Sequence, residues 1–148
     1  YLKNGGKAKN AERGRAFALF RLGKDDEAKP ILESMIKLED EKKLLAITEV
    51  VPIPGTDRQW TVVYDSRSTL GWLHYRNEEY DKATKYFTET LNKYPFLIDA
   101  LTGMGYVKLK QNDKKAAEKF FVDALKLSPY YPDAIAGYNQ ATDKKSDT

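Results

Sequence analysis

The chain has 148 residues, about one domain by length, of which 32% are charged and 41% are hydrophobic. These proportions are typical of a soluble protein. The net charge of only +3, with acidic and basic residues interleaved, argues against nucleic acid or an anionic membrane as the partner. The absence of cysteine excludes disulfides and thiolate metal sites, and no apolar run approaches the ~20 residues needed to span a bilayer. The composition does not distinguish a cytoplasmic from a periplasmic protein.

The N-terminal part of the chain predicts one pair of helices after a polar start. Residues 1–10 are expected to be a frayed end or the tail of a preceding helix. Residues 11–22 carry apolar side chains at helical spacing, and Gly23 ends that helix. The acidic residues in 24–27 favour the N-terminus of a second helix, in which Pro30 falls in the first turn, where its missing N–H is tolerated.

An insertion is predicted over residues 43–63. Two prolines and a glycine within residues 51–55 cannot lie inside a helix and predict a turn. We expect the flanking residues to lengthen the neighbouring helices, with Asp57 capping a helix in which Trp60 packs against its neighbour. The alternative is a short strand over residues 59–64, because Trp-Thr-Val-Val-Tyr is rich in β-branched and aromatic residues.

The rest of the chain predicts two more helix pairs and one unpaired last helix. Polar turns are expected at residues 77–79 and 111–113, and Pro95 and Pro129 close the second helix of each pair. The expected helices cover residues 68–76, 80–94, 98–110, 114–127 and 132–143.

These two pairs share a set of residues at a constant spacing of 34. Small residues on both helices of a pair let the two backbones approach closely, and the aromatic residue and leucine fill the groove between successive pairs. Since one pair cannot bury its apolar face alone, the pairs must stack. The matching residues are Gly71 and Gly105, Ala83 and Ala117, Phe87 and Phe121, Leu91 and Leu125, and Pro95 and Pro129.

This pattern resembles the tetratricopeptide repeat family. The leucine–glycine pair of the family corresponds to Leu70-Gly71 and Met104-Gly105, and Ala124 matches a later core position. The second repeat departs from the pattern at His74 and Thr90. The first repeat is weaker. It keeps Ala16, Gly23, Ala28, Leu32 and Ile36, but has Asp40 in place of the closing proline.

The resemblance implies an all-α fold, a right-handed α-solenoid of about three helix pairs with a C-terminal capping helix. Ala28 and Ala83 are 55 residues apart, 21 more than the repeat, so an extended helical insertion or loop separates the first two repeats. We expect a single domain over residues 1–143. Its expected parts are repeats at about 9–42, 64–97 and 98–131, the insertion at 43–63, the capping helix at 132–143 and a disordered tail at 144–148.

In this family the first helices of successive repeats line a concave groove. An aromatic stripe with basic edges in such a groove favours a peptide or protein partner, because these side chains bury much area and keep a polar group. The implied function is a non-enzymatic scaffold for protein–protein interaction. The groove residues implied by the register are Arg13, Phe17, Phe20, Arg21, Trp72, Tyr75, Arg76, Tyr106 and Lys110.

No catalytic or metal site is predicted, and no cofactor. His74 is the only histidine, and its place beside core residues favours a packing role. Catalytic triads and zinc sites need partners that the sequence lacks, and Gly103-Met104-Gly105 falls inside a helix rather than in a phosphate-binding loop.

Three further alternatives follow from the residues. The RNA-binding pentatricopeptide family has a slightly longer period, so the 34-residue spacing argues against it. The positions at which some relatives hold a chaperone's C-terminal carboxylate contain only one basic residue, Arg13, so we expect no such clamp. The alternative to a binding scaffold is self-assembly into a homo-oligomer, or a structural segment of a larger complex such as an export or envelope machine.

Overall fold

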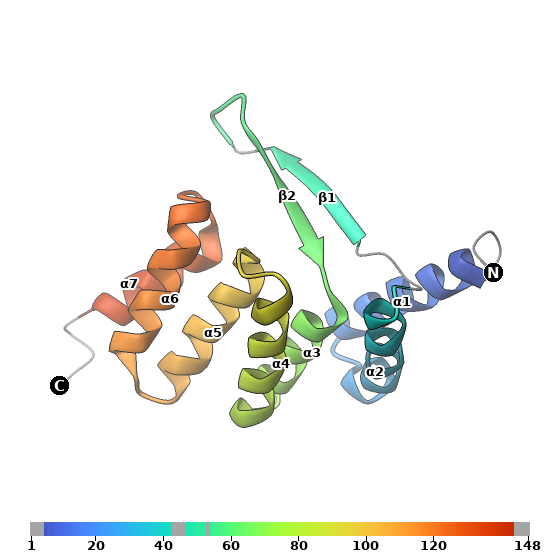
Figure 1. Ribbon diagram of the computed structural model, residues 1–148. Helices are drawn as coiled ribbons and strands as arrows, with labels where there is room; N and C mark the ends of the chain where they lie inside the picture. Colours follow the sequence, from blue (N-terminus) through green and yellow to red (C-terminus); the bar gives the residue numbers. More distant parts are fainter. Residues whose placement is uncertain (1–4, 43–46, 53, 144–148) are drawn as a thin grey trace.

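The computed structural model describes residues 5–42, 47–52 and 54–143 of the chain. Within these ranges the helices form successive antiparallel pairs that stack side by side into an arc, from which a β-hairpin projects (Figure 1). The elements are α1 (Gly5–Arg21), α2 (Asp25–Asp40), β1 (Ile47–Pro52), β2 (Gln59–Tyr64), α3 (Ser66–Arg76), α4 (Tyr80–Lys93), α5 (Ile98–Lys110), α6 (Lys114–Leu127) and α7 (Pro132–Thr142). The predicted all-α solenoid is confirmed.

The turn inside each helix pair uses the same backbone device. Gly23, Glu78 and Asn112 occupy matching positions between the two helices of their pairs, and all three have positive φ, at 77°, 61° and 59°. A left-handed residue reverses the chain tightly at the end of a helix. Asp113 then accepts a hydrogen bond from the Ala116 backbone N–H at 3.1 Å, which caps α6. The turns therefore repeat in conformation although glycine occurs in only one of them.

Phenylalanine rings packed between glycines hold the later pairs together. The ring of Phe87 on α4 lies between Gly71 on α3 and Gly103 on α5, so close that a Cβ on either glycine would be within 3.0 Å of it. Phe121 lies in the same way between Gly105 and Gly137. Both rings are fully buried. Each ring therefore joins the two helices of its own pair to the first helix that follows.

The junction between the first and second pairs is instead polar. Arg13 on α1 pairs with Glu39 on α2 at 2.9 Å, and both side chains are almost completely buried. The same carboxylate accepts a hydrogen bond from the Ser66 hydroxyl at the start of α3, at 2.7 Å. Arg67 pairs with Asp40 nearby. Charged hydrogen bonds thus connect α1, α2 and α3, beside an apolar core that includes Ala16, Leu32 and Leu70.

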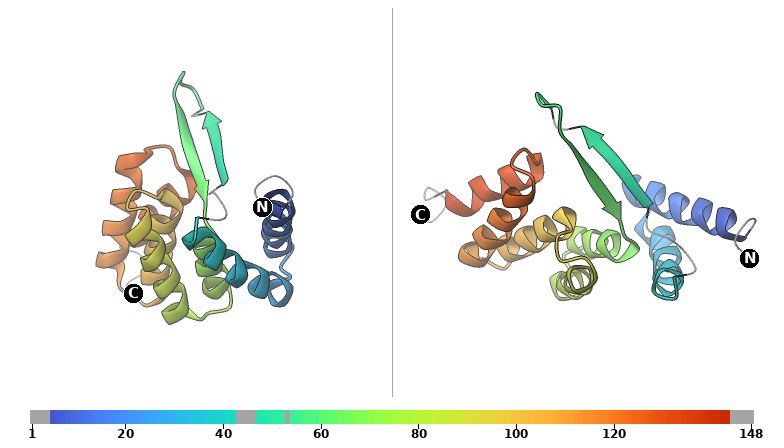
Figure 2. Two further views of the ribbon diagram at one scale, coloured as in Figure 1. Left: turned by 45° about the vertical axis from the view of Figure 1, so that its right-hand side comes forward. Right: turned by 45° about the horizontal axis from the view of Figure 1, so that its top comes forward.

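The insertion is a two-stranded antiparallel sheet, so the helical interpretation of residues 43–63 is wrong. Ile47 pairs with Tyr64 at the base of the hairpin, and Pro52 pairs with Gln59 near its tip (Figure 2). The strands are rich in β-branched residues, and Gly55 reverses the chain with φ at 77°. Asp57 lies exposed in the turn and caps no helix. The expected packing of Trp60 concerns a side chain outside the described part of the chain.

Candidate peptide-binding face

The first helices of the pairs, α1, α3, α5 and α7, line the inner side of the arc (Figure 2). Three aromatic residues at matching or adjacent positions on this face form one cluster. Trp72 and Tyr75 on α3 have ring centroids 5.5 Å apart, and Tyr106 on α5 lies 6.1 Å from Trp72 and 6.3 Å from Tyr75. Edge-on contacts of this kind are favourable and keep the rings in fixed positions. The cluster joins two successive pairs on the face where the sequence predicts binding.

Two hydrogen bonds fix the cluster to the following helix. The Trp72 indole Nε1 donates to Asp99 Oδ1 at 3.0 Å, and the Ser68 hydroxyl donates to the other oxygen of that carboxylate. The Tyr106 hydroxyl donates to the backbone carbonyl of Asp133 at 2.7 Å. Trp72 and Tyr106 therefore contribute to the stack itself as well as to the exposed face.

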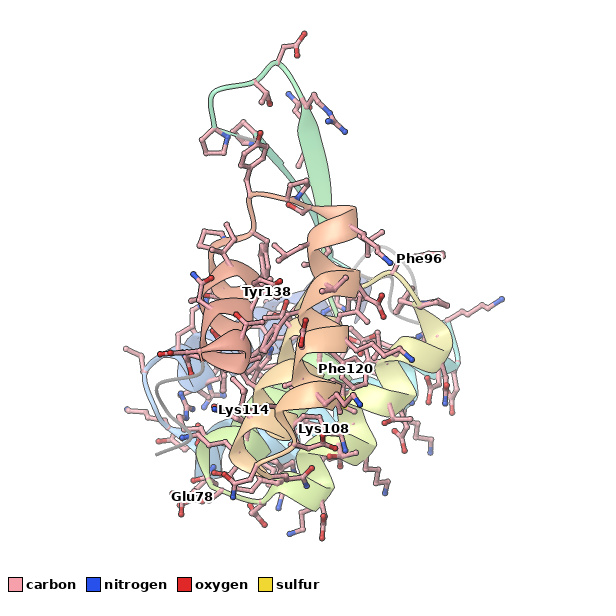
Figure 3. All side chains as sticks on the ribbon, turned by 90° about the vertical axis from the view of Figure 1, so that its left-hand side faces the viewer. Glu78, Phe96, Lys108, Lys114, Phe120 and Tyr138 are labelled. Atoms are coloured by element: carbon pink, nitrogen blue, oxygen red, sulfur yellow. The ribbon has the colours of Figure 1, made fainter. Side chains whose placement is uncertain are left out.

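A pocket of about 280 Å³ opens beside this cluster, where the C-terminal ends of α3, α5 and α7 come together. Tyr75, Tyr106 and Leu109 give it apolar walls, and Lys110 and Lys114 give it cationic groups. Figure 3 shows Lys114 toward the same end of the molecule as the turn residue Glu78, and Phe96 toward the end that carries the hairpin. The pocket is lined by Tyr75, Tyr106, Leu109, Lys110, Lys114, Gln140 and Asp143.

The two tyrosines of the pocket are neutral phenols at physiological pH. Burial raises the pKa of Tyr75, with further contributions from Tyr80 and Tyr106. Burial also raises the pKa of Tyr106, together with the nearby charge of Asp133. The Lys114 ammonium donates to the Asp143 carbonyl at 3.4 Å, and Lys110 is exposed. The pocket thus combines aromatic surface with positive charge and can accept an apolar side chain next to an acidic group.

Arg13 does not belong to this face, and its predicted role in the groove is wrong. Its side chain is 1% exposed and is enclosed by Glu39 and by Asn10, to which it donates at 3.0 Å. The cation compensates a buried carboxylate, so it cannot reach a ligand without leaving that charge unpaired.

Phe20 and Arg76 are brought together, but in contact with each other. The Arg76 guanidinium lies 4.3 Å from the centre of the Phe20 ring and donates to the Phe20 carbonyl at 2.9 Å. Arg76 also pairs with Asp25 at the start of α2. Phe17 packs half-buried against the N-terminal core, and Arg21 is exposed at the end of α1. Of the nine predicted residues, the pocket and its cluster thus unite Trp72, Tyr75, Tyr106 and Lys110.

Sequence reasoning missed three lining residues. Gln140 and Asp143 lie on or just after α7, 34 residues after Tyr106 and Leu109, so continuing the repeat register into the last helix would have found both. Lys114 begins a second helix, and a register restricted to the first helices cannot include it. The pocket depends on the capping helix because that helix continues the same face.

The lone histidine has a structural environment. His74 is buried, stacks on Tyr86 with ring centroids 5.4 Å apart, and its Nδ1 lies 3.2 Å from Glu79 Oε1. Within the described residues no group of three or more His, Cys, Asp or Glu side chains is arranged to hold a metal ion. In the same part of the chain, no helix combines the length and apolar character that crossing a bilayer needs.

Comparisons with known proteins identify the repeat. Residues 68–96 and 98–131 each match a tetratricopeptide repeat model. Among solved structures, the fold is similar to the C-terminal TPR-containing domain of a Plasmodium falciparum protein that is named as an FK506-binding protein. The TM-score is 0.68 at 13% sequence identity, and the match covers 99% of this chain and 94% of that one. A comparison with curated proteins found no match.

The resemblance inferred from the sequence is therefore confirmed: the chain carries tetratricopeptide repeats. Such repeats generally mediate protein–protein interaction and are typical of non-enzymatic scaffolds.

Proposed function

We propose that the chain is a protein-interaction module that binds a peptide or protein segment on the face lined by α3, α5 and α7. The observation that supports this function best is the pocket beside Tyr75 and Tyr106, because it offers aromatic walls and two lysines at one place on the inner side of the arc. Aromatic and basic side chains are the usual anchors of protein interfaces.

The pocket chemistry favours one kind of segment. An apolar or aromatic side chain would contact the rings of Tyr75 and Tyr106, and an acidic side chain next to it would pair with Lys110. The segment would continue along the face past Trp72 toward Phe17 and Arg21 on α1. An extended strand or an amphipathic helix fits this description.

The test uses charge reversal at the rim, since alanine at Trp72 or Tyr106 would also remove bonds between helix pairs. Lys110→Glu changes an exposed residue of the pocket, and Lys119→Glu makes the same change at an exposed position of α6 outside the pocket. We expect a partner captured from lysate by the wild type and by Lys119→Glu to be lost with Lys110→Glu. Equal capture by all three proteins would contradict the assignment.

The alternative function, self-assembly or a structural role in a larger complex, is supported by the hairpin. Its strands pair chiefly with each other and project from the stack (Figure 1). An isolated two-stranded sheet is marginally stable, which favours a second surface that covers it. Light scattering tests this alternative directly: a mass that rises with concentration supports it, and a monomer mass at every concentration contradicts self-assembly.

A further inference from the structure

The repeat register identifies a position on α1 that the stack fills everywhere else with a ring. Gly103 and Gly137 lie on the first helices of successive units, and each contacts the phenylalanine of the preceding second helix, Phe87 and Phe121 respectively. Counting back from Gly103 by the repeat of 34 residues and then by the interval of 55 leads to Thr69 and to Gly14. Gly14 is therefore the position on α1 that would face the second helix of an earlier pair.

Gly14 is uncovered. Among the described residues outside its own turn of helix, no heavy atom lies within 4 Å of the place that a Cβ would occupy. Ala11 and Ala18, on the same side of α1, are also exposed. Their counterparts in the later units are buried, with 0 to 7% of their surface exposed: Ala100, Val107, Ala134 and Ala141.

The rest of this side of α1 adds apolar and positive groups. Leu22 is 72% exposed, and its backbone N–H donates to the Ala18 carbonyl at 3.0 Å, so it continues the same side by one turn. Arg15 lies exposed between Ala11 and Ala18, where the matching positions of the next two units hold buried Leu70 and Met104. A helix packed here would find a close approach at Gly14 and a cation beside it.

We propose that this open junction face, formed by Ala11, Gly14 and Ala18, receives the second helix of a further tetratricopeptide pair, with a phenylalanine packed over Gly14 and an acidic residue facing Arg15. The occupant follows from the molecule itself, because the same register position contacts a phenylalanine ring at both later junctions. The face lies at the outer end of the stack (Figure 2) and is separate from the pocket, so the proposal goes beyond the peptide-binding function.

The test supplies such a pair in the correct register. Pro132 corresponds to Lys9, so a copy of residues 98–131 joined directly before Lys9 places its Phe121 over Gly14. We expect the melting temperature of this extended chain to exceed that of the original by about 5 °C, since each added repeat interface stabilises a solenoid. We also expect backbone amides of α1 to exchange with solvent at least about tenfold more slowly.

Two variants decide whether the gain comes from Gly14. Gly14→Leu should abolish the gain in the extended chain and leave the original chain as stable as before, because nothing described lies near the new side chain there. Phe121→Ala in the added copy alone should remove most of the same gain. The proposal is overturned if the extended chain melts no higher and α1 exchanges at its original rate, or if the gain survives both substitutions.

Discussion

The first junction of the stack and the two later ones solve the same packing problem with different chemistry. Between α4 and α5, and between α6 and α7, a buried phenylalanine ring lies against glycine backbone. Between α2 and α3 the corresponding residue is Leu32, and a buried ion pair of Arg13 and Glu39, extended to Ser66, connects the helices. The family pattern is clear where the contact is a ring on glycine and weak where it is ionic.

The difference also explains where the hairpin is tolerated. The polar contacts of the first junction come from residues immediately before and after the insertion, at the end of α2 and the start of α3. These contacts fix both ends of the inserted segment, so its length has little effect on the stack. The comparison predicts different responses to mutation at the two kinds of junction.

The largest loss of stability is expected from Phe87→Ala. The ring is fully buried between two glycines that cannot fill the space it leaves, so the free energy of unfolding should fall by about 4 kcal/mol. Urea denaturation followed by circular dichroism measures the change. Leu32→Ala at the first junction serves as the matched substitution, and an equal or larger loss there would contradict the greater weight given to the ring.

A somewhat smaller loss, about 3 kcal/mol, is expected from Glu39→Ala, because Arg13 would remain buried without its partner. The double variant Arg13→Met/Glu39→Leu should recover much of this loss, since apolar residues of similar size can replace a buried ion pair. The same denaturation experiment compares the three proteins. A double variant less stable than Glu39→Ala would show that the charges themselves are required.

The same substitution is expected to have opposite effects at filled and open positions. Gly137→Ala places a methyl group against the Phe121 ring and should destabilise the protein by about 1–3 kcal/mol. Gly14→Ala meets no described atom and should stabilise it by about 0.5–1 kcal/mol, because alanine is the better helix former. Melting temperatures of the two variants give the signs. Destabilisation by both would mean that Gly14 is already covered.

The smallest expected effect is a pH dependence at Asp99, which joins the second and third pairs. Burial raises the pKa of this carboxyl, against the lowering effect of its hydrogen bonds from Ser68 and Trp72. The folded state therefore keeps a proton that the unfolded state releases, and the contribution of Asp99 to stability falls as pH rises above the ordinary carboxyl pKa. Asp99→Asn removes the titration, so its melting temperature should gain on the wild type between acidic and neutral pH. A constant difference would show that Asp99 does not titrate in this interval.

How far the fold is predictable depends on which residues carry the signal. Gly71, Phe87 and their counterparts 34 residues later determine the helix pairs, because only small residues permit the close approach of two helices around a ring. The hairpin was harder to predict. Its valines and threonines fit either a lengthened helix or a strand, and no repeat partner exists for comparison.

The candidate site was predictable in part for a related reason. The register correctly places Trp72, Tyr75 and Tyr106 on one face, since they follow the repeat. It cannot show that Arg13 turns inward, because the position matches Ser68 and Thr102 and only the distant Glu39 makes an arginine acceptable there. Long-range charge pairing is a property of the folded chain and leaves no local pattern.

The bonds from Trp72 to Asp99 and from Tyr106 to Asp133 have a mechanical consequence. Each spans two successive units on the inner side of the arc, with the same separation of 27 residues. When an arc is straightened, its inner side lengthens most, so tension along the stack would load these two bonds before the glycine–phenylalanine contacts at the centre. The solenoid is thus a spring whose stiffness depends on polar bonds beside the pocket, and a segment bound there would make it stiffer.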